Sequence, residues 1–168
     1  MKEIDEIDLK ILGFLQQDGR MPVSEIGEKV ELSSPSVADR IHKFEEKGII
    51  QKYTAILNAR EIGKDVTAFI GVSVSHPQGI PHFESVIGRI GDILECHHVT
   101  GEHTFRLKIK TRNTQTLEEV IRQIRSIEGV TRTETEVVLS TTFEHTEVLL
   151  NDVEQNKERP LRSVVRAR

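Results

Sequence analysis

The chain has 168 residues, of which 36% are hydrophobic and 30% are charged, and its net charge is −4. These proportions are typical of one ordinary globular domain or two small ones, and no run approaches the roughly 18 apolar residues that a membrane span requires. The amino-terminal residues carry acids where a secretion signal would carry bases, and the single cysteine, Cys96, excludes an internal disulfide or a CxxC pair. We therefore expect a cytoplasmic protein without membrane contact.

Residues 1–57 show the spacing of three helices. Apolar side chains recur at helical intervals over residues 7–15 and again over 23–30. A tight turn at residues 31–33 precedes a third helix, for which Ser34 is the expected N-cap and Pro35 the first helical residue. A three-residue turn between the last two helices is typical of a helix-turn-helix.

The third helix has a clear apolar stripe and a clear end. Val37, Ile41 and Phe44 recur at helical spacing and predict one buried face, and Gly48 predicts the carboxy-terminal stop. The segment 49–57 alternates apolar and polar residues as a small wing strand would. We therefore expect a winged helix-turn-helix domain over residues 1–57.

A change of period follows a polar linker at residues 58–65. Beyond it, strand-like and helix-like segments succeed one another in the order β-α-β-β-α-β, which is that of a ferredoxin-like sandwich. The expected domain spans residues 66–143, and the whole chain is of the α+β class. A tail, 144–168, becomes basic towards its end and is interpreted as a dimer arm, a DNA-contacting arm or a disordered segment. The expected segments are strand 66–74, helix 83–90, strands 93–101 and 105–109, helix 117–127 and strand 130–142.

Three blocks of the sequence together resemble the Lrp/AsnC family of transcriptional regulators. The first is residues 4–57, and the others are ECHHVTGEH at 95–103 and GVTRTETEVVL at 129–139. The resemblance covers residues 3 to about 143. It implies a DNA-binding amino-terminal half and a carboxy-terminal half that dimerises and senses small molecules, often amino acids. It also implies a homodimer that assembles into higher oligomers.

The side of the third helix opposite its apolar stripe is the expected contact with double-stranded DNA. Residues 33–60 carry five basic side chains against three acidic ones, whereas residues 1–32 carry four against eight, so the charge is segregated. Residues early in a recognition helix reach base edges and later ones lie along phosphates. We assign base contacts to Ser36 and Arg40, and phosphate contacts to the others. The expected DNA-binding residues are Ser33, Ser34, Ser36, Arg40, Lys43, Lys47 and Lys52. The alternative is a solvated helix face, paired locally with Asp39 and Glu46.

The turn after the second expected strand is the candidate effector site. Gly101 in this turn allows backbone N–H groups to converge on a carboxylate, and Glu102 suits an ammonium group. In the resembling family the effector lies between dimers, bordered by this turn and the last strand, where three threonines alternate onto one face. That family usually has Asp where this chain has Thr104. The expected effector residues are Gly101, Glu102, His103, Thr104, Thr131, Thr133 and Thr135. An ordinary hairpin with a threonine-rich edge is the alternative.

The sequence shows no catalytic constellation, and we predict no metal and no cofactor. His97 and His98 are neighbours on a strand and so face opposite sides, while His98 and His103 lack an evident third ligand. Two other functions remain open. One is an architectural, nucleoid-type DNA-binding protein. The other is an enzyme similar to the sirohaem decarboxylases, which resemble this two-domain family and use histidines for a tetrapyrrole.

Overall fold

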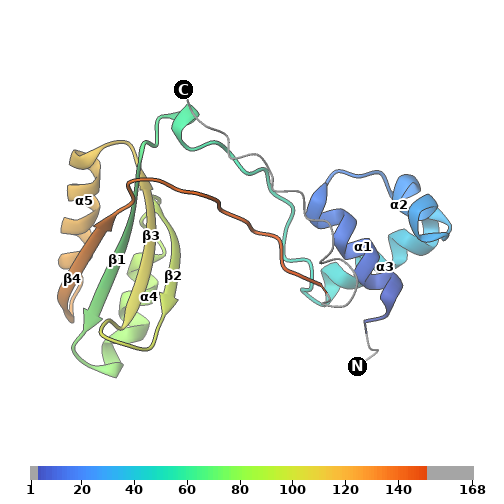
Figure 1. The fold of residues 1–168 in the computed structure, drawn as a ribbon. Coiled ribbons are helices and arrows are strands. Elements are labelled where there is room, and N and C mark those ends of the chain that lie inside the picture. Colours follow the sequence, from blue (N-terminus) through green and yellow to red (C-terminus); the bar gives the residue numbers. More distant parts are fainter. Residues whose placement is uncertain (1–3, 151–168) are drawn as a thin grey trace. The chain divides into compact units, whose positions relative to one another are not determined.

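The computed structural model describes residues 4–150, which divide into two compact units (Figure 1). One unit runs through Ile56 and includes the segment from Thr142 onward, and the other spans Leu57–Thr141. Among residues 4–150, no helix combines the length and apolar character needed to cross a bilayer.

The first unit is a bundle of three helices, as the spacing predicted. They are α1 (Glu6–Gln17), α2 (Val23–Val30) and α3 (Ser34–Glu46). Each helix contributes one apolar stripe, and burying these stripes against one another is the main favourable term in the folding of the unit. Ile41 is partly buried beside this core. The buried residues are Ile11, Leu12, Ile26, Val30, Val37 and Phe44.

The turn between α2 and α3 approaches α2 closely. A Cβ atom at Gly27 would lie 2.6 Å from the carbonyl oxygen of Leu32, so only glycine leaves room for the turn. Ser33 has the extended backbone of an N-cap, and its hydroxyl accepts the N–H of Ser36. The prediction that Ser34 is the N-cap is therefore wrong by one residue, because Ser34 is already helical.

The predicted stop of α3 at Gly48 is confirmed. Gly48 has a φ of 67°, and the N–H groups of Ile49 and Ile50 donate to the carbonyl of Phe44. The predicted wing strand at 49–57 is wrong. A strand needs a partner for its backbone N–H and C=O groups, and none of residues 4–150 pairs with this segment as a strand.

The second unit is an antiparallel sheet of four strands in the order β2-β3-β1-β4. The chain order of its elements is β-α-β-β-α-β, which confirms the ferredoxin-like prediction. Short 3₁₀ turns lie at Arg60–Ile62 and Pro77–Gly79. The strands and helices are β1 (Val66–Val74), α4 (Ile80–Ile87), β2 (Ile93–His98), β3 (Phe105–Thr111), α5 (Thr114–Arg125) and β4 (Val130–Val137).

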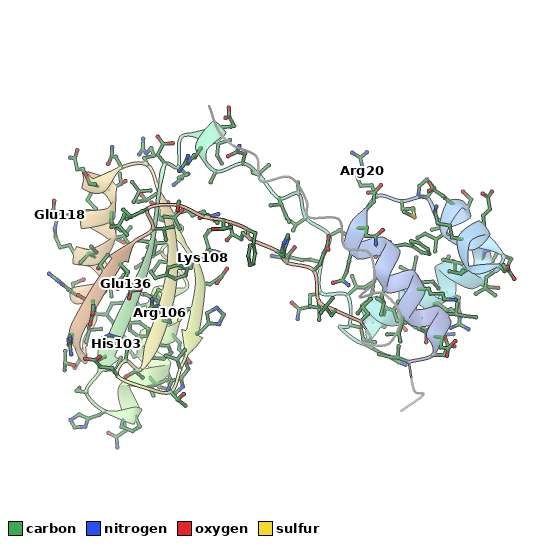
Figure 2. The ribbon with its side chains drawn as sticks, in the orientation of Figure 1. Arg20, His103, Arg106, Lys108, Glu118 and Glu136 are labelled. Atoms are coloured by element: carbon green, nitrogen blue, oxygen red, sulfur yellow. The ribbon has the colours of Figure 1, made fainter. Side chains whose placement is uncertain are left out.

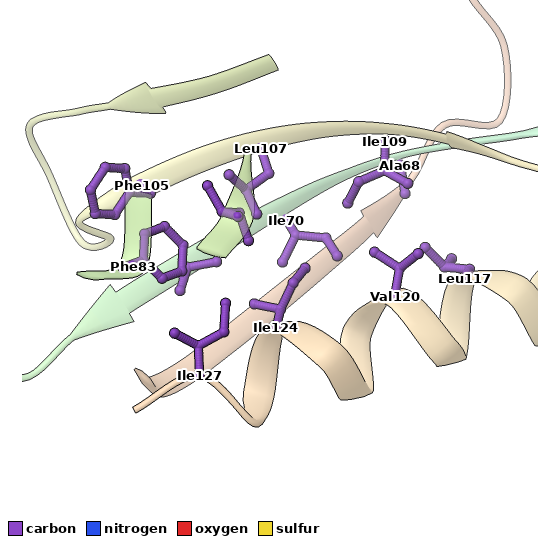
Figure 3. Packing of buried hydrophobic residues seen from close by; sticks show 12 residues of the cluster. Ala68, Ile70, Phe83, Phe105, Leu107, Ile109, Leu117, Val120, Ile124 and Ile127 are labelled. Atoms are coloured by element: carbon purple, nitrogen blue, oxygen red, sulfur yellow. The ribbon is translucent and has the colours of Figure 1, made fainter. Parts of the chain in front are cut away.

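Helices α4 and α5 cover one face of this sheet (Figure 1). Alternate residues of β1 and β3 point into the layer between sheet and helices, where the ring of Phe83 from α4 stacks on that of Phe105 at 4.6 Å (Figure 3). The other alternate residues of these strands lie on a second face, called the uncovered face below. The core residues are Ala68, Ile70, Val72, Phe83, Ile87, Phe105, Leu107, Ile109, Leu117, Val120, Ile124 and Ile127.

Strand β4 is shorter than the sequence indicated. It ends at Val137 rather than Thr142. Val137 is paired in register with Ala68 of β1, and the last bond runs from the N–H of Val138 to the carbonyl of Thr67. Farther along, the backbone N–H and C=O of Val148 bond to the side chain of Gln16 at 2.7 and 2.9 Å. The basic end of the tail, 151–168, lies outside the described residues.

The close approach at Gly27 predicts an unusual mutational result. Alanine normally stabilises a helix interior relative to glycine, but at Gly27 it would push against the Leu32 carbonyl, so we expect Gly27→Ala to lose about 1–3 kcal/mol of unfolding free energy. Gly13→Ala in α1 is the matched control, because its Cβ meets only a Leu150 methyl carbon at 3.9 Å. We expect it to be neutral or to gain up to about 1 kcal/mol. Urea unfolding followed by circular dichroism measures both, and equal stability of the two variants would contradict the packing.

Candidate nucleic-acid interface and effector region

The outer side of α3 presents serines near its start and lysines near its end. Ser34, Ser36, Lys43 and Lys47 are all exposed, and Lys52 is exposed in the segment that follows. Four backbone N–H groups at the start of any helix lack intrahelical partners, so this end suits a phosphate oxygen. The side therefore offers hydroxyl and N–H donors at one end and ammonium groups at the other.

Local contacts modify this pattern. The Lys43 ammonium pairs with the Asp39 carboxylate one turn earlier, and this pair lowers the pKa of Asp39. The Ser33 hydroxyl caps the helix and lies 2.8 Å from the Ser36 hydroxyl. Both ends of the side are nevertheless open to solvent, since Ser34 and Ser36 are exposed and the Lys43 side chain is 55% exposed. An exposed pair of this kind contributes little to stability and is easily exchanged for a phosphate.

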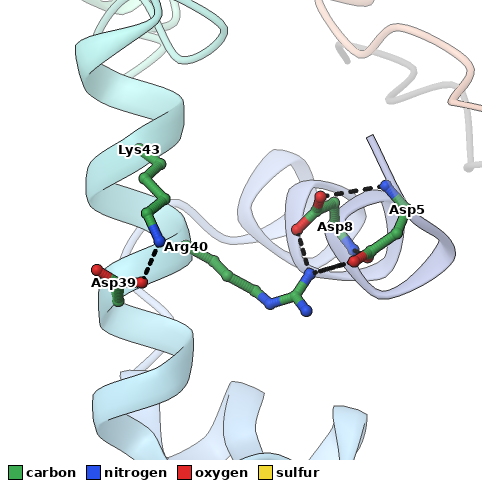
Figure 4. A network of polar contacts seen from close by, with 5 residues as sticks. All are labelled: Asp5, Asp8, Asp39, Arg40 and Lys43. Carbon is green, nitrogen blue, oxygen red and sulfur yellow. Dashed lines mark hydrogen bonds and ion pairs between the residues drawn. The ribbon is translucent and has the colours of Figure 1, made fainter. Parts of the chain in front are cut away.

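Arg40 does not share this side. Its Nη1 donates to the two carboxylate oxygens of Asp5 at 2.9 and 2.7 Å and to Oδ1 of Asp8 at 2.5 Å (Figure 4). The side chain is only 28% exposed. The expectation that Arg40 points outward with the lysines is thus corrected: its guanidinium lies against α1.

The two acids that receive Arg40 also cap α1. The Asp8 N–H donates to Asp5 Oδ1 at 2.8 Å, and the Asp5 N–H donates to Asp8 Oδ2 at 3.1 Å. The Arg40 guanidinium lowers the pKa of the Asp5 carboxyl, and the two carboxylates in turn raise the pKa of Arg40. We call Arg40, Asp5 and Asp8 the Arg40 clamp, because it joins the middle of α3 to the first turn of α1.

The clamp was not apparent from the sequence. Arg40 directly precedes Ile41 at the border of the apolar stripe. Helical spacing alone is therefore compatible with an outward Arg40, as predicted, and with one that lies against a neighbouring helix. The deciding partners lie 32 and 35 residues earlier. An acidic capping pair at one helix start and an arginine at the edge of another stripe are the only signals available.

The turn after β2 is fastened to β1 by Thr104. Its N–H donates to the carbonyl of Val72 at 2.9 Å, and its hydroxyl accepts the N–H of Val74 at 3.1 Å. Gly101 has a φ of 122°, which disfavours any other residue there. Thr104 therefore holds the end of the turn that contains Gly101, Glu102 and His103 against β1.

Two of the three threonines of β4, Thr131 and Thr133, border a hollow beside α5. Strand register pairs Thr133 with Val72, a residue of the helix-covered side. Arg125 Nε donates to the Thr133 hydroxyl at 2.7 Å, while the Thr131 hydroxyl donates to the Ser73 carbonyl at 3.2 Å. Thr135 follows two residues along the same side. The hollow has a volume of about 390 Å³ and is lined by Arg125, Val130, Thr131, Arg132 and Thr133.

Glu102 and His103 lie on the opposite, uncovered face. His103 Nε2 is 3.2 Å from Glu134 Oε2, and Glu134 is paired in register with Gly71. Arg132 Nη1 donates to Glu102 at 2.6 Å. Within one chain the seven expected effector residues therefore do not converge, because the sheet separates the glutamate and histidine from the threonines.

The uncovered face carries charged side chains in pairs. Arg106 pairs with Glu136 and lies over the Phe69 ring at 5.5 Å, and Lys108 pairs with Glu95 at 2.9 Å. Figure 2 labels His103, Arg106, Lys108 and Glu136 along this sheet. Opposite charges facing one another across strands stabilise a sheet and define its register.

The other histidines of this region point in different directions. His97 Nε2 lies 3.3 Å from Glu95, on the uncovered face. The ring of His98 stacks on Phe105 at 5.0 Å, towards the helix-covered side. The rings of His97, His98 and His103 therefore do not converge on one point at which they could bind a common substrate.

Comparison with known proteins matches both units. Residues 4–45 match the model of the AsnC-type helix-turn-helix domain, and residues 67–148 match that of the Lrp/AsnC ligand binding domain. The HTH-type transcriptional regulator FL11 of Pyrococcus furiosus is 34% identical over 145 residues, which are 86% of this chain and 95% of that protein.

Two solved structures share the fold and carry an amino acid. One is a transcriptional regulator of Neisseria meningitidis in complex with L-methionine, with a TM-score of 0.83 and 28% identity, covering 89% of this chain and 98% of that one. The other is the feast or famine regulatory protein of M. tuberculosis complexed with L-methionine, with a TM-score of 0.81 and 26% identity, covering 87% and 99%.

The Arg40 clamp predicts that Arg40 contributes to stability. Arg40→Ala leaves the Asp8 carboxylate, which is 14% exposed, without its guanidinium partner, so we expect a loss of about 1–2 kcal/mol of unfolding free energy. Lys43→Ala is the control and should change stability little, because its pair with Asp39 is exposed. Urea unfolding at pH 7 compares them, and equal losses would contradict the clamp.

The same variant has an expected pH dependence. Because the folded pKa of Asp5 lies below its ordinary value of 3.8, its contribution is present above that value and is lost as the pH falls through the lowered pKa. The difference in unfolding free energy between wild type and Arg40→Ala should therefore be constant near neutral pH and should decrease only in acid. A difference that widens in acid would contradict the assignment.

Proposed function

Because the chain belongs to the Lrp/AsnC family of transcriptional regulators, we propose that the outer side of α3 enters the major groove of double-stranded DNA. Support comes from the exposure of Ser34 and Ser36 at the start of the helix and of Lys43 and Lys47 at its end. In a helix-turn-helix the first residues of the second helix meet base edges, and later ones follow the backbone. Ser36 is then the base contact, and the lysines, with Lys52, are phosphate contacts.

Arg40 has a different part in this proposal. Its guanidinium already holds Asp5 and Asp8, so a base contact would require the Arg40 clamp to open and would leave two carboxylates without their cation. We therefore assign Arg40 to holding the orientation of α3, and Ser33 to capping it. The observation that supports this assignment is the set of three short bonds from one guanidinium nitrogen to α1.

A second copy of the chain is the expected partner. Two segments leave large apolar side chains uncovered: Ile56 is 76% exposed, Leu139 94% and Phe143 73%. Covering such side chains is the usual driving force of a homodimer, and a dimer would place two α3 helices about one DNA turn apart. Higher oligomers of that dimer belong to the same proposal. Sedimentation at micromolar concentration tests it, and a monomer would contradict it.

The hollow beside β4 is the proposed site of an amino-acid effector. Arg125 and the hydroxyls of Thr131 and Thr133 supply a cation and two hydrogen-bonding groups, which is the chemistry that an α-carboxylate requires. Two proteins of similar fold are known with L-methionine, so methionine is the first ligand to test. The protein would then act as a cytoplasmic regulator rather than an enzyme.

Removing two lysines tests the DNA contact. We expect Lys43→Ala with Lys47→Ala to weaken binding uniformly across sequences and to lower the slope of log affinity against log salt by about 2 for each α3 on the DNA, which is about 4 for a dimer. Arg122→Ala is a matched control, because Arg122 is an exposed cation on α5 with an acidic partner, Glu118, four residues earlier. Fluorescence anisotropy over a salt series measures the slopes. An unchanged slope in the double variant would refute the contact.

Arg125→Gln tests the effector hollow. Loss of one charge-assisted hydrogen bond to a carboxylate should weaken methionine binding by about 10- to 100-fold. Arg122→Gln, one turn earlier on α5, should leave it unchanged. Isothermal titration with methionine and a panel of other amino acids gives the affinities. Equal affinities of both variants for methionine would show that the effector does not bind in this hollow. If no amino acid binds the wild type, the proposal of an amino-acid effector is wrong.

A further inference from the structure

We propose that Glu102, His103 and Glu134 form a binding site for a divalent transition-metal ion such as Zn²⁺. The three side chains lie on the uncovered face of the sheet, and their ligand atoms are all within 4.8 Å of one another. One imidazole and two carboxylates are a ligand set that Zn²⁺ accepts, with water in the fourth position. None of these three residues lines the effector hollow, although Arg132, which bonds to both carboxylates, does.

The backbone leaves a recess for the His103 ring. A Cβ atom at Gly71 would lie 2.3 Å from the Cδ2 of His103, so any side chain at that position of β1 would displace the ring. The His103 side chain is consequently only 11% exposed although it follows an open turn. A histidine held in a recess of the sheet loses little further freedom when it binds an ion.

The two ring nitrogens have the partners that a metal-binding histidine uses. Nδ1 lies 3.3 Å from the Ser73 hydroxyl, and Nε2 lies 3.2 Å from a Glu134 oxygen. If Nδ1 carries the proton, it donates to Ser73, and the lone pair of Nε2 then faces a carboxylate. That arrangement is favourable only with a cation between them. The Ser73 hydroxyl can donate to Nδ1 when the proton is on Nε2, and it can accept from Nδ1 when a metal ion is bound at Nε2.

The distances suit tetrahedral coordination. Zn²⁺ bonds of about 2.0–2.1 Å place neighbouring ligand atoms about 3.3 Å apart, and the Nε2–Oε2 distance at His103 and Glu134 is already 3.2 Å. Glu102 completes the set by a side-chain rotation, for which its 65% exposure leaves room. Two of the three ligands are therefore in position.

The guanidinium of Arg132 already occupies part of the site. Arg132 donates from Nη1 to Glu102 at 2.6 Å and from Nη2 to Glu134 at 3.2 Å, bridging the two carboxylates. The Arg132 side chain is 57% exposed and can leave towards solvent when an ion enters. Arg132 and the metal ion are thus competitors for the same two carboxylates.

The experiment measures Zn²⁺ binding to the full chain by competition with a chromophoric chelator, supported by the visible absorption of bound Co²⁺. The wild type should bind one equivalent, and His103→Ala should bind at least about 100-fold more weakly. Glu134→Gln keeps the side-chain shape and should weaken binding at least about tenfold. Arg132→Ala should tighten binding about two- to fivefold, since an exposed competitor is removed. Circular dichroism checks that each variant is folded.

His97→Ala is the matched control. His97 lies on the same face, with one carboxylate partner, Glu95, but outside the cluster. Unchanged binding in this variant together with the losses above would establish the site. The proposal is overturned if the wild type does not bind one equivalent of Zn²⁺ saturably, if His103→Ala binds Zn²⁺ as tightly as the wild type, or if Arg132→Ala binds it more weakly.

Discussion

A single guanidinium, that of Arg40, ties α3 to the two acids at the start of α1. The apolar stripe of α3 buries Val37 and Phe44, but an apolar contact is non-directional and leaves a helix free to roll by small amounts. Hydrogen bonds from Arg40 to the capping acids of α1 are directional and remove that freedom. They also ensure that Ser36 and Lys43 point away from the bundle. In our proposal, a residue that the sequence suggested for reading DNA instead helps to determine what the neighbouring residues present to it.

In the second unit the sheet separates two kinds of chemistry. On the side of α5, Arg125, Thr131 and Thr133 border a hollow suited to a carboxylate. On the uncovered face, paired charges and His103 collect around Glu134. Because successive side chains of a strand alternate between faces, Thr133 and Glu134 belong to different sites although they are neighbours. The proposed effector and the proposed metal ion can therefore act on the same strand without sharing ligands.

Much of the fold was predictable because it follows from local periodicity. The three helices, the stop at Gly48 and the order of strands in the sandwich each depend on spacing within about ten residues. Apart from the one-residue error at the N-cap of α3, the failures involve partners distant in the chain. The wing at 49–57 lacked a pairing strand, and the pairing of β4 with β1 stops near Thr67, short of the predicted end of β4.

The candidate sites show the same division. The outward direction of Lys43 and the shared face of the threonines follow from helix and strand geometry alone. The engagement of Arg40 with Asp5, and the arrival of Glu134 beside His103, required knowledge of how α1 meets α3 and how β4 meets β1. For this reason the sequence did not indicate Glu134 as a partner of His103.

The most direct test of the account compares the DNA sequences preferred by wild type and Arg40→Ala. Both proteins select from a randomised duplex library at a temperature where circular dichroism shows each to be folded. The account predicts the same preferred sequence for both, with weaker overall binding by the variant. Loss of preference at one base pair, with unchanged unfolding free energy, would show that Arg40 reads a base and would contradict the clamp.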